Sequence, residues 1–125
     1  MFTKDPEKME SLLGSNSNFK GDLNVKGTLR VDGRAEGRLD ADCVILSEKA
    51  VVKGDIQGKK IIVGGTVEGN LRAQEIVEIK SKGRVLGDIF SRKLVVMEGA
   101  EFTGRVETKK MEENIIGLEF RSQEA

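Results

Sequence analysis

The sequence of 125 residues contains no histidine, tryptophan or tyrosine, and it has only one cysteine and one proline. Histidine is the most common general base and metal ligand, so its absence argues against an enzyme and against a metal site. A single cysteine cannot form an internal disulfide and is typical of a reducing compartment. No apolar run is long enough to span a membrane, and the first residues lack the apolar core of a signal peptide. The sequence therefore predicts a cytoplasmic protein that is not an enzyme.

The charges are dense but balanced, with 21 basic and 21 acidic residues. A nucleic-acid-binding domain usually has a strong basic excess, so we expect no direct nucleic-acid partner. The Gly64-Gly65 pair comes nearest to a phosphate-binding loop, but no Gly-Lys-Ser or Gly-Lys-Thr follows it. We therefore expect neither a bound nucleotide nor another cofactor.

A pattern centred on glycine occurs six times in the chain, with an apolar residue two positions before the glycine and another two positions after it. The steps between successive glycines are 16, 17, 15, 18 and 17 residues. Such a period is too short for a helical repeat and fits one coil of a β-solenoid, in which glycine allows the chain to bend. The sequence therefore predicts about six coils. The recurring glycines are Gly21, Gly37, Gly54, Gly69, Gly87 and Gly104.

Apolar and polar residues alternate through the repeats, which indicates strands with one buried face. We predict an all-β core over residues 19–106, with a flexible N-terminal tail over 1–18 and a C-terminal tail or partial cap over 107–125. Pro6 lies outside this core, as the pairing of strands requires. Cys43 begins the apolar run 43–46, so we interpret it as a core residue rather than a nucleophile.

The first and last coils differ from the others in carrying phenylalanine at the apolar position before the glycine, where the middle coils have Ala or Val. The open end of a solenoid invites pairing with another chain. We predict a polymerisation interface at these ends, although the large side chains could equally complete the core. Head-to-tail stacking would give a polar filament and head-to-head stacking a non-polar one. The predicted interface residues are Phe19, Leu23, Phe102 and Val106.

The two ends of the chain do not share the repeat. Met1, Phe2 and Lys4 combine apolar groups with a cation and form a candidate membrane-binding peptide, which many copies in a filament would reinforce. Acidic residues nearby oppose attraction to anionic lipid. The C-terminal segment contains apolar residues that favour either a cap or a docking peptide. The acidic residues are Asp5, Glu7 and Glu10, and the apolar ones are Met111, Ile115, Ile116, Leu118 and Phe120.

Several stretches of the repeat share a more specific pattern. They are Lys20-Gly21-Asp22-Leu23, Gly27-Thr28-Leu29-Arg30-Val31-Asp32-Gly33, Ala35-Glu36-Gly37, Val67-Glu68-Gly69-Asn70-Leu71 and Val85-Leu86-Gly87-Asp88-Ile89. Over residues 12–106 the chain resembles the bactofilins, β-helical cytoskeletal proteins of bacteria. The resemblance implies a right-handed parallel β-helix of triangular section that polymerises without nucleotide into non-polar filaments. It also implies a membrane-targeting peptide, whose pattern Met1, Phe2 and Lys4 match.

The sequence and the resemblance together predict a cytoskeletal scaffold. Its partners would be further copies of itself, membrane lipid, and cell-wall enzymes or other proteins that it positions. We expect it in the cytoplasm, peripherally associated with the inner membrane. The alternative is a β-solenoid that does not polymerise and holds a protein partner through its faces or its C-terminal tail.

Overall fold

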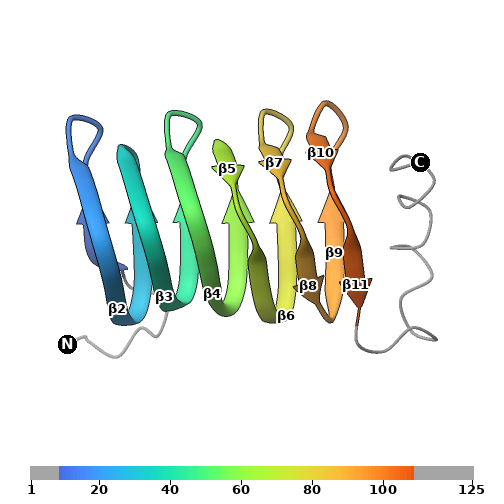
Figure 1. Ribbon diagram of the computed structural model, residues 1–125, viewed down its shortest axis with the longest axis horizontal. Helices are drawn as coiled ribbons and strands as arrows, with labels where there is room; N and C mark the ends of the chain where they lie inside the picture. The colour runs from blue at the N-terminus through green and yellow to red at the C-terminus, as the bar shows by residue number, and fades with distance from the viewer. Residues whose placement is uncertain (1–8, 109–125) are drawn as a thin grey trace.

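The computed structural model describes residues 9–108, and every regular element among them is a β-strand. The coils stand side by side along the long axis of the molecule, which gives it the shape of a rod (Figure 1). Within the described residues there is no helix with the length and apolar character needed to cross a membrane. The strands are β1 (Met9–Leu13), β2 (Asn18–Val31), β3 (Arg34–Leu46), β4 (Val51–Val63), β5 (Thr66–Glu68), β6 (Leu71–Ile79), β7 (Arg84–Leu86), β8 (Ile89–Ser91), β9 (Lys93–Val96), β10 (Glu101–Thr103) and β11 (Val106–Thr108).

Each coil contributes three runs of strand, which pair in parallel with the same runs of the coils on either side. The run before the recurring glycine forms the first face of the rod, and the run after it forms the second face. The third face contains β1, residues 28–31, 43–46, 60–63 and 76–79, and β9. Each face has six levels along the rod. The prediction of a parallel β-solenoid of about six coils is therefore confirmed.

The uneven period of the repeat arises mainly at the corner between the third face and the first, and register shifts of one residue between the second and third faces account for the rest. Residues 32–33 and 64–65 form corners of two residues, and the glycine steps that contain them are 16 and 15 residues. Residues 47–50, 80–83 and 97–100 form corners of four residues, and the steps are then 17, 18 and 17. Each longer corner is closed by a backbone hydrogen bond, as from Ala50 N–H to the Ser47 carbonyl at 3.0 Å. The strands can thus keep their register while the corners absorb insertions.

The recurring glycine stands at the bend between the first and second faces. Gly69 has a φ of +150°, a conformation that residues with a Cβ rarely adopt. A Cβ built on Gly69 would also lie 1.8 Å from the carbonyl oxygen of Gly54 in the coil before it. Two independent requirements, the backbone angle and the close stacking of coils, therefore select glycine at this position.

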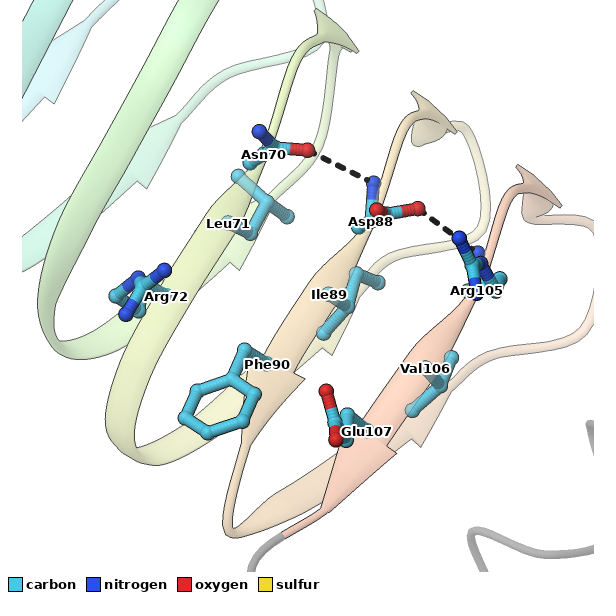
Figure 2. A pocket seen from close by; sticks show the side chains of 9 residues that line it. All are labelled: Asn70, Leu71, Arg72, Asp88, Ile89, Phe90, Arg105, Val106 and Glu107. Atoms are coloured by element: carbon cyan, nitrogen blue, oxygen red, sulfur yellow. Dashed lines mark hydrogen bonds between the residues drawn. The ribbon is translucent and has the colours of Figure 1, made fainter.

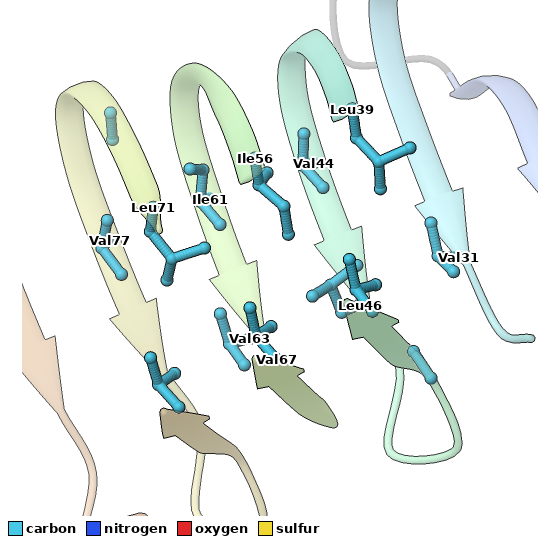
Figure 3. Packing of buried hydrophobic residues seen from close by; sticks show 14 of the residues in the cluster. Val31, Leu39, Val44, Leu46, Ile56, Ile61, Val63, Val67, Leu71 and Val77 are labelled. Atoms are coloured by element: carbon cyan, nitrogen blue, oxygen red, sulfur yellow. The ribbon is translucent and has the colours of Figure 1, made fainter. Parts of the chain in front are cut away.

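Side chains on the inner surface of the three faces fill the centre of the rod (Figure 3). Leu39, Ile56 and Leu71 occupy equivalent positions on successive coils and are at most 1% exposed. The prediction that Cys43 belongs to this core is wrong, because alternation along its strand directs Val44 and Leu46 inward. Cys43 is half-buried on the outer surface of the third face.

The N-terminal boundary of the rod differs from the predicted one. The predicted tail over 1–18 includes β1, which pairs with β2 from Met9 opposite Thr28 to Leu13 opposite Val31. Gly14 and Ser17 then form a turn of the same kind as the longer corners, with a hydrogen bond of 2.9 Å. The candidate membrane peptide, Met1, Phe2 and Lys4, and nearly all of the predicted C-terminal tail lie outside the described residues.

Candidate polymerisation interface

The apolar residues that face the centre of the rod fall into two groups by burial. Those of the middle coils are fully buried, whereas a second group is packed against the core and remains partly exposed at the two ends. This second group comprises Leu13, Phe19, Leu23, Val25, Val96, Ala100, Phe102 and Val106. The rod therefore ends in two apolar surfaces that are continuous with its core.

The N-terminal end is formed by β1 and the first half of β2. Residues 18–25 pair only with β3, and β1 pairs only with β2, so each has one open edge within residues 9–108. Phe19 and Leu23 lie here, on either side of Gly21, and both are half-buried. The structure thus places two of the predicted interface residues on one open end.

The C-terminal end is formed by β9, β10 and β11. Each pairs with a single strand of the preceding coil among the described residues: β9 with β6, β10 with β7, and β11 with β8. Phe102 and Val106 lie on β10 and β11, and both are half-buried. The other two predicted residues therefore occupy the opposite end, so the four form two surfaces about one rod length apart.

Open strand edges and half-exposed core side chains supply two complementary kinds of contact. The edge presents unpaired backbone donors and acceptors, a template for another strand. The apolar side chains lose contact with water when a further coil covers them, which is favourable. Neither kind of contact needs a cofactor or a covalent step, so the arrangement is suited to stacking rods rather than to chemistry.

Four members of the end surfaces were not predicted from the sequence, namely Leu13, Val25, Val96 and Ala100. Phe19 and Phe102 were found because their size departs from the repeat. Val96 has the same side chain as many core residues, and only its level in the rod distinguishes it. Leu13 was missed because β1 lies in a segment that resembled a linker.

A chain of hydrogen bonds runs along the bend between the first and second faces. Asn70 N–H donates to Asp55 Oδ1 at 3.3 Å, Asp88 N–H to Asn70 Oδ1 at 3.2 Å, and Arg105 N–H to Asp88 Oδ1 at 3.3 Å. Figure 2 shows the last two of these bonds. Each Asp or Asn oxygen thus caps a backbone group of the next coil, which explains these residue types without a catalytic role.

A shallow hollow of about 480 Å³ lies on the second face near the C-terminal end. Its lining includes Asp88 and Arg105 of the hydrogen-bonded chain, and Phe90, whose ring lies 5.4 Å from the Arg72 guanidinium carbon. Arg72 and Phe90 are adjacent in the ladder, so this contact also connects two coils. The polar groups of the hollow serve mainly to hold successive coils together.

Ion pairs on the surface lie both within coils and between them. Arg30 contacts Asp32 at 3.0 Å and Lys80 contacts Glu78 at 3.3 Å, each within one coil of the third face. Arg84 and Glu101 join two coils at 3.0 Å. The hydrogen bond from Arg30 holds the pKa of Asp32 below its usual value, because it stabilises the charged form of this carboxylate.

The fold and its ends define a class of protein: a parallel β-solenoid rod with two apolar ends, each of which has open strand edges within residues 9–108. Residues 11–107 match the family model for bactofilins, which describes polymer-forming cytoskeletal proteins. The chain belongs to the bactofilin family.

Two relatives come from Myxococcus xanthus. The chain is 36% identical to bactofilin BacP over 103 residues, which cover 82% of this chain but only 43% of BacP. It is 29% identical to bactofilin BacO over 98 residues, which cover 78% of both proteins. The fold matches a cryo-EM reconstruction of Thermus thermophilus bactofilin double helical filaments with a TM-score of 0.74 and 23% identity. That match covers 80% of this chain and all of the other.

Proposed function

We propose that this protein is a cytoskeletal scaffold whose rods polymerise end to end without nucleotide into non-polar filaments. The observation that carries the proposal is the confinement of half-buried core residues to the two open ends. Stacking of two rods would continue the strand ladders across the joint and bury Phe19 or Phe102 against its counterpart. We also propose that two filaments associate side by side, as in the double helical filaments of the Thermus thermophilus relative.

We further propose that the filaments lie on the inner face of the membrane and position cell-envelope enzymes or other proteins there. Met1, Phe2 and Lys4 would insert apolar groups and a cation at the lipid surface. A single copy of such a short peptide binds weakly, but a filament displays it at every subunit, so the copies act together. The acidic residues that follow make this attachment depend on the polymer rather than on one strong site.

The test of polymerisation is sedimentation and negative-stain microscopy of the purified protein without nucleotide. We expect the wild-type protein to pellet as filaments and Phe102→Arg to stay in the supernatant, because the guanidinium groups would be buried at the joint. Phe90→Arg, on the side of the rod, is the matched control and should still pellet. Long filaments of Phe102→Arg would contradict the proposal, and a dispersed wild-type protein would favour the non-polymerising alternative.

The membrane proposal requires a different comparison. A chain that begins at Met9 removes the candidate peptide and keeps β1, whereas a start further on would also damage the rod. We expect wild-type filaments to float with vesicles that contain anionic lipid and the shortened filaments to stay at the bottom. Equal flotation of both would show that residues 1–8 do not attach the protein to lipid.

A further inference from the structure

The outer surface of the third face differs from that of the other two. On the second face, the two outward residues that follow each recurring glycine are charged or amide side chains in every coil, with Phe90 as the exception. On the third face, one outward residue from each level forms a column, which we call the outer column, and four of its six members are apolar. From the N-terminal to the C-terminal level it reads Leu12, Arg30, Ile45, Ile62, Glu78 and Val95.

The order of the outer column has the symmetry of a self-complementary surface. Consider a two-fold axis that lies between two rods, perpendicular to their length, at the height midway between Ile45 and Ile62. This axis brings Ile45 of one rod opposite Ile62 of the other. The same operation brings Arg30 opposite Glu78, and Leu12, which is 51% exposed, opposite Val95. Apolar residues therefore meet apolar residues, and each basic residue meets an acidic one.

The neighbouring corner positions have the same complementarity. Asp32 and Lys80 occupy equivalent places one residue after the strand run, on the same levels as Arg30 and Glu78. The two-fold axis brings Asp32 opposite Lys80. Two levels of each rod therefore present an ion pair. Along the strand, the basic residue comes first in the pair of Arg30 and Asp32, and the acidic residue comes first in the pair of Glu78 and Lys80.

We propose that the third face binds the third face of a second copy, with the two rods side by side and antiparallel. This inference rests on the proposed polymer, because it identifies the surface through which two filaments associate and the relative direction of the two rods that meet there. The direction follows from the charges: a parallel pair of rods at equal height would put Arg30 against Arg30 and Glu78 against Glu78. Like charges in contact are unfavourable, whereas the antiparallel arrangement brings Arg30 opposite Glu78 and Asp32 opposite Lys80.

The size of the face predicts when this contact forms. Six levels at about 4.8 Å give a length of about 29 Å, and four residues at about 3.3 Å give a width of about 13 Å. The face therefore offers roughly 380 Å² per rod, less than half of the area per partner in a stable complex. Single rods should not pair, but the face repeats along a filament, so the contacts of many subunits act together.

The test reverses the order of each ion pair without changing the net charge. In one variant Arg30→Glu is combined with Asp32→Arg, and in another Glu78→Lys is combined with Lys80→Glu. Each local pair is preserved with its order reversed, so the opposite level on the second rod now meets like charges. We expect each variant to form filaments that are single rather than paired, and the variant with all four changes to regain pairing.

The matched control exchanges two charges on the first face, Lys53→Glu with Glu68→Lys, and should leave pairing unchanged. Cryo-EM of the filaments gives both readouts, filament formation and pairing. Filaments that stay paired in either reversed variant, or single filaments in the fourfold variant, would overturn the inference and leave the proposed polymer intact. Wild-type filaments that are single, or that lie on vesicles through the third face, would overturn it too. Absence of all filaments would instead refute the proposed function.

Discussion

The close stacking of the recurring glycines predicts that replacement by alanine costs more stability in a middle coil than in the first coil. Gly69 has the glycine of the preceding coil next to it, whereas Gly21 has none within residues 9–108. Gly69→Ala would place a Cβ 1.8 Å from the Gly54 carbonyl oxygen. At Gly21 the nearest atom to such a Cβ belongs to Phe19 and is 3.7 Å away, since within residues 9–108 no strand lies before this glycine on its side of the rod. Both glycines have positive φ, +150° and +134°, so both substitutions introduce a similar backbone strain.

The difference in the free energy of unfolding between Gly69→Ala and Gly21→Ala gives the cost of moving two stacked coils apart. Ordinary van der Waals contact begins at 3.4 Å, so the alanine at 69 must move the carbonyl away by 3.4 − 1.8 = 1.6 Å. Nearby, Ile56 N–H donates to the Asn70 carbonyl at 2.9 Å between the same two coils, and such a shift would break this bond. Strained backbone costs about 1–3 kcal/mol in both variants. One or two lost backbone bonds add about 2–4 kcal/mol at position 69 alone.

The free energy of unfolding is best measured on dispersed rods, for which a background with Leu23→Arg and Phe102→Arg, one charge at each end, is suitable. A difference of about 3 kcal/mol is a large part of the stability of a domain. With the urea dependence typical of small proteins, it lowers the midpoint of Gly69→Ala by about 1–3 M relative to Gly21→Ala. Equal midpoints for the two variants would refute the reasoning that close stacking selects glycine in the middle coils.

Three further predictions concern the stability of the same dispersed rods. Leu71→Ala should cost about 2–5 kcal/mol in urea unfolding because its side chain is 1% exposed, whereas Leu86→Ala, at 46% exposed, should change stability by less than about 0.5 kcal/mol. Asn70→Ala removes the acceptor of Asp88 N–H and should cost about 1 kcal/mol, with Gln57→Ala as a control near zero. The lowered pKa of Asp32 stabilises the fold above pH 3.8, and this contribution is lost as the pH falls through the folded pKa. Asp32→Asn should therefore reduce the free energy of unfolding at pH 7 by less than about 1 kcal/mol, and the free energy should fall less steeply as the pH is lowered. The same dependence on pH in the variant and the wild-type protein would contradict a lowered pKa of Asp32.

The coil was predictable from the sequence because two physical requirements act on one residue. The bend at each recurring glycine needs positive φ, and the stacked coils leave no space for a Cβ, so glycine recurs even where the surrounding sequence varies. The alternation of apolar and polar residues then indicated strands with an inner surface. Together these signals predicted the class of fold before any resemblance was considered.

The N-terminal boundary and the position of Cys43 were not predictable in the same way. β1 carries no recurring glycine, and the polar residues that follow it also suit a linker. Cys43 precedes three apolar residues, so composition alone suggested burial, whereas the strand directs alternate residues outward. Local composition therefore predicted the wrong environment in both segments, and pairing with the next coil decided the outcome.

The ends and the outer column depend on the register between coils. Phe19 and Phe102 could be recognised by size, but Leu13 and Val96 could not, because their burial depends on which level lacks a neighbour. The opposition of Arg30 and Glu78 also depends on the level of each residue. The corners contain either two or four residues, so the spacing along the sequence changes from coil to coil. The level of a residue such as Glu78 therefore cannot be assigned from the sequence until the length of each corner is known.

The central claim is that rods stack end to end with continuous strand ladders, and the axial spacing of subunits in filaments tests it most directly. Six levels per subunit at the spacing of paired strands give about 29 Å for each rod, with no gap at either joint. Cryo-EM of wild-type filaments should show this spacing, with Phe19 and Phe102 buried at the joints. A clearly larger spacing, or filaments in which both phenylalanines face solvent, would contradict the account.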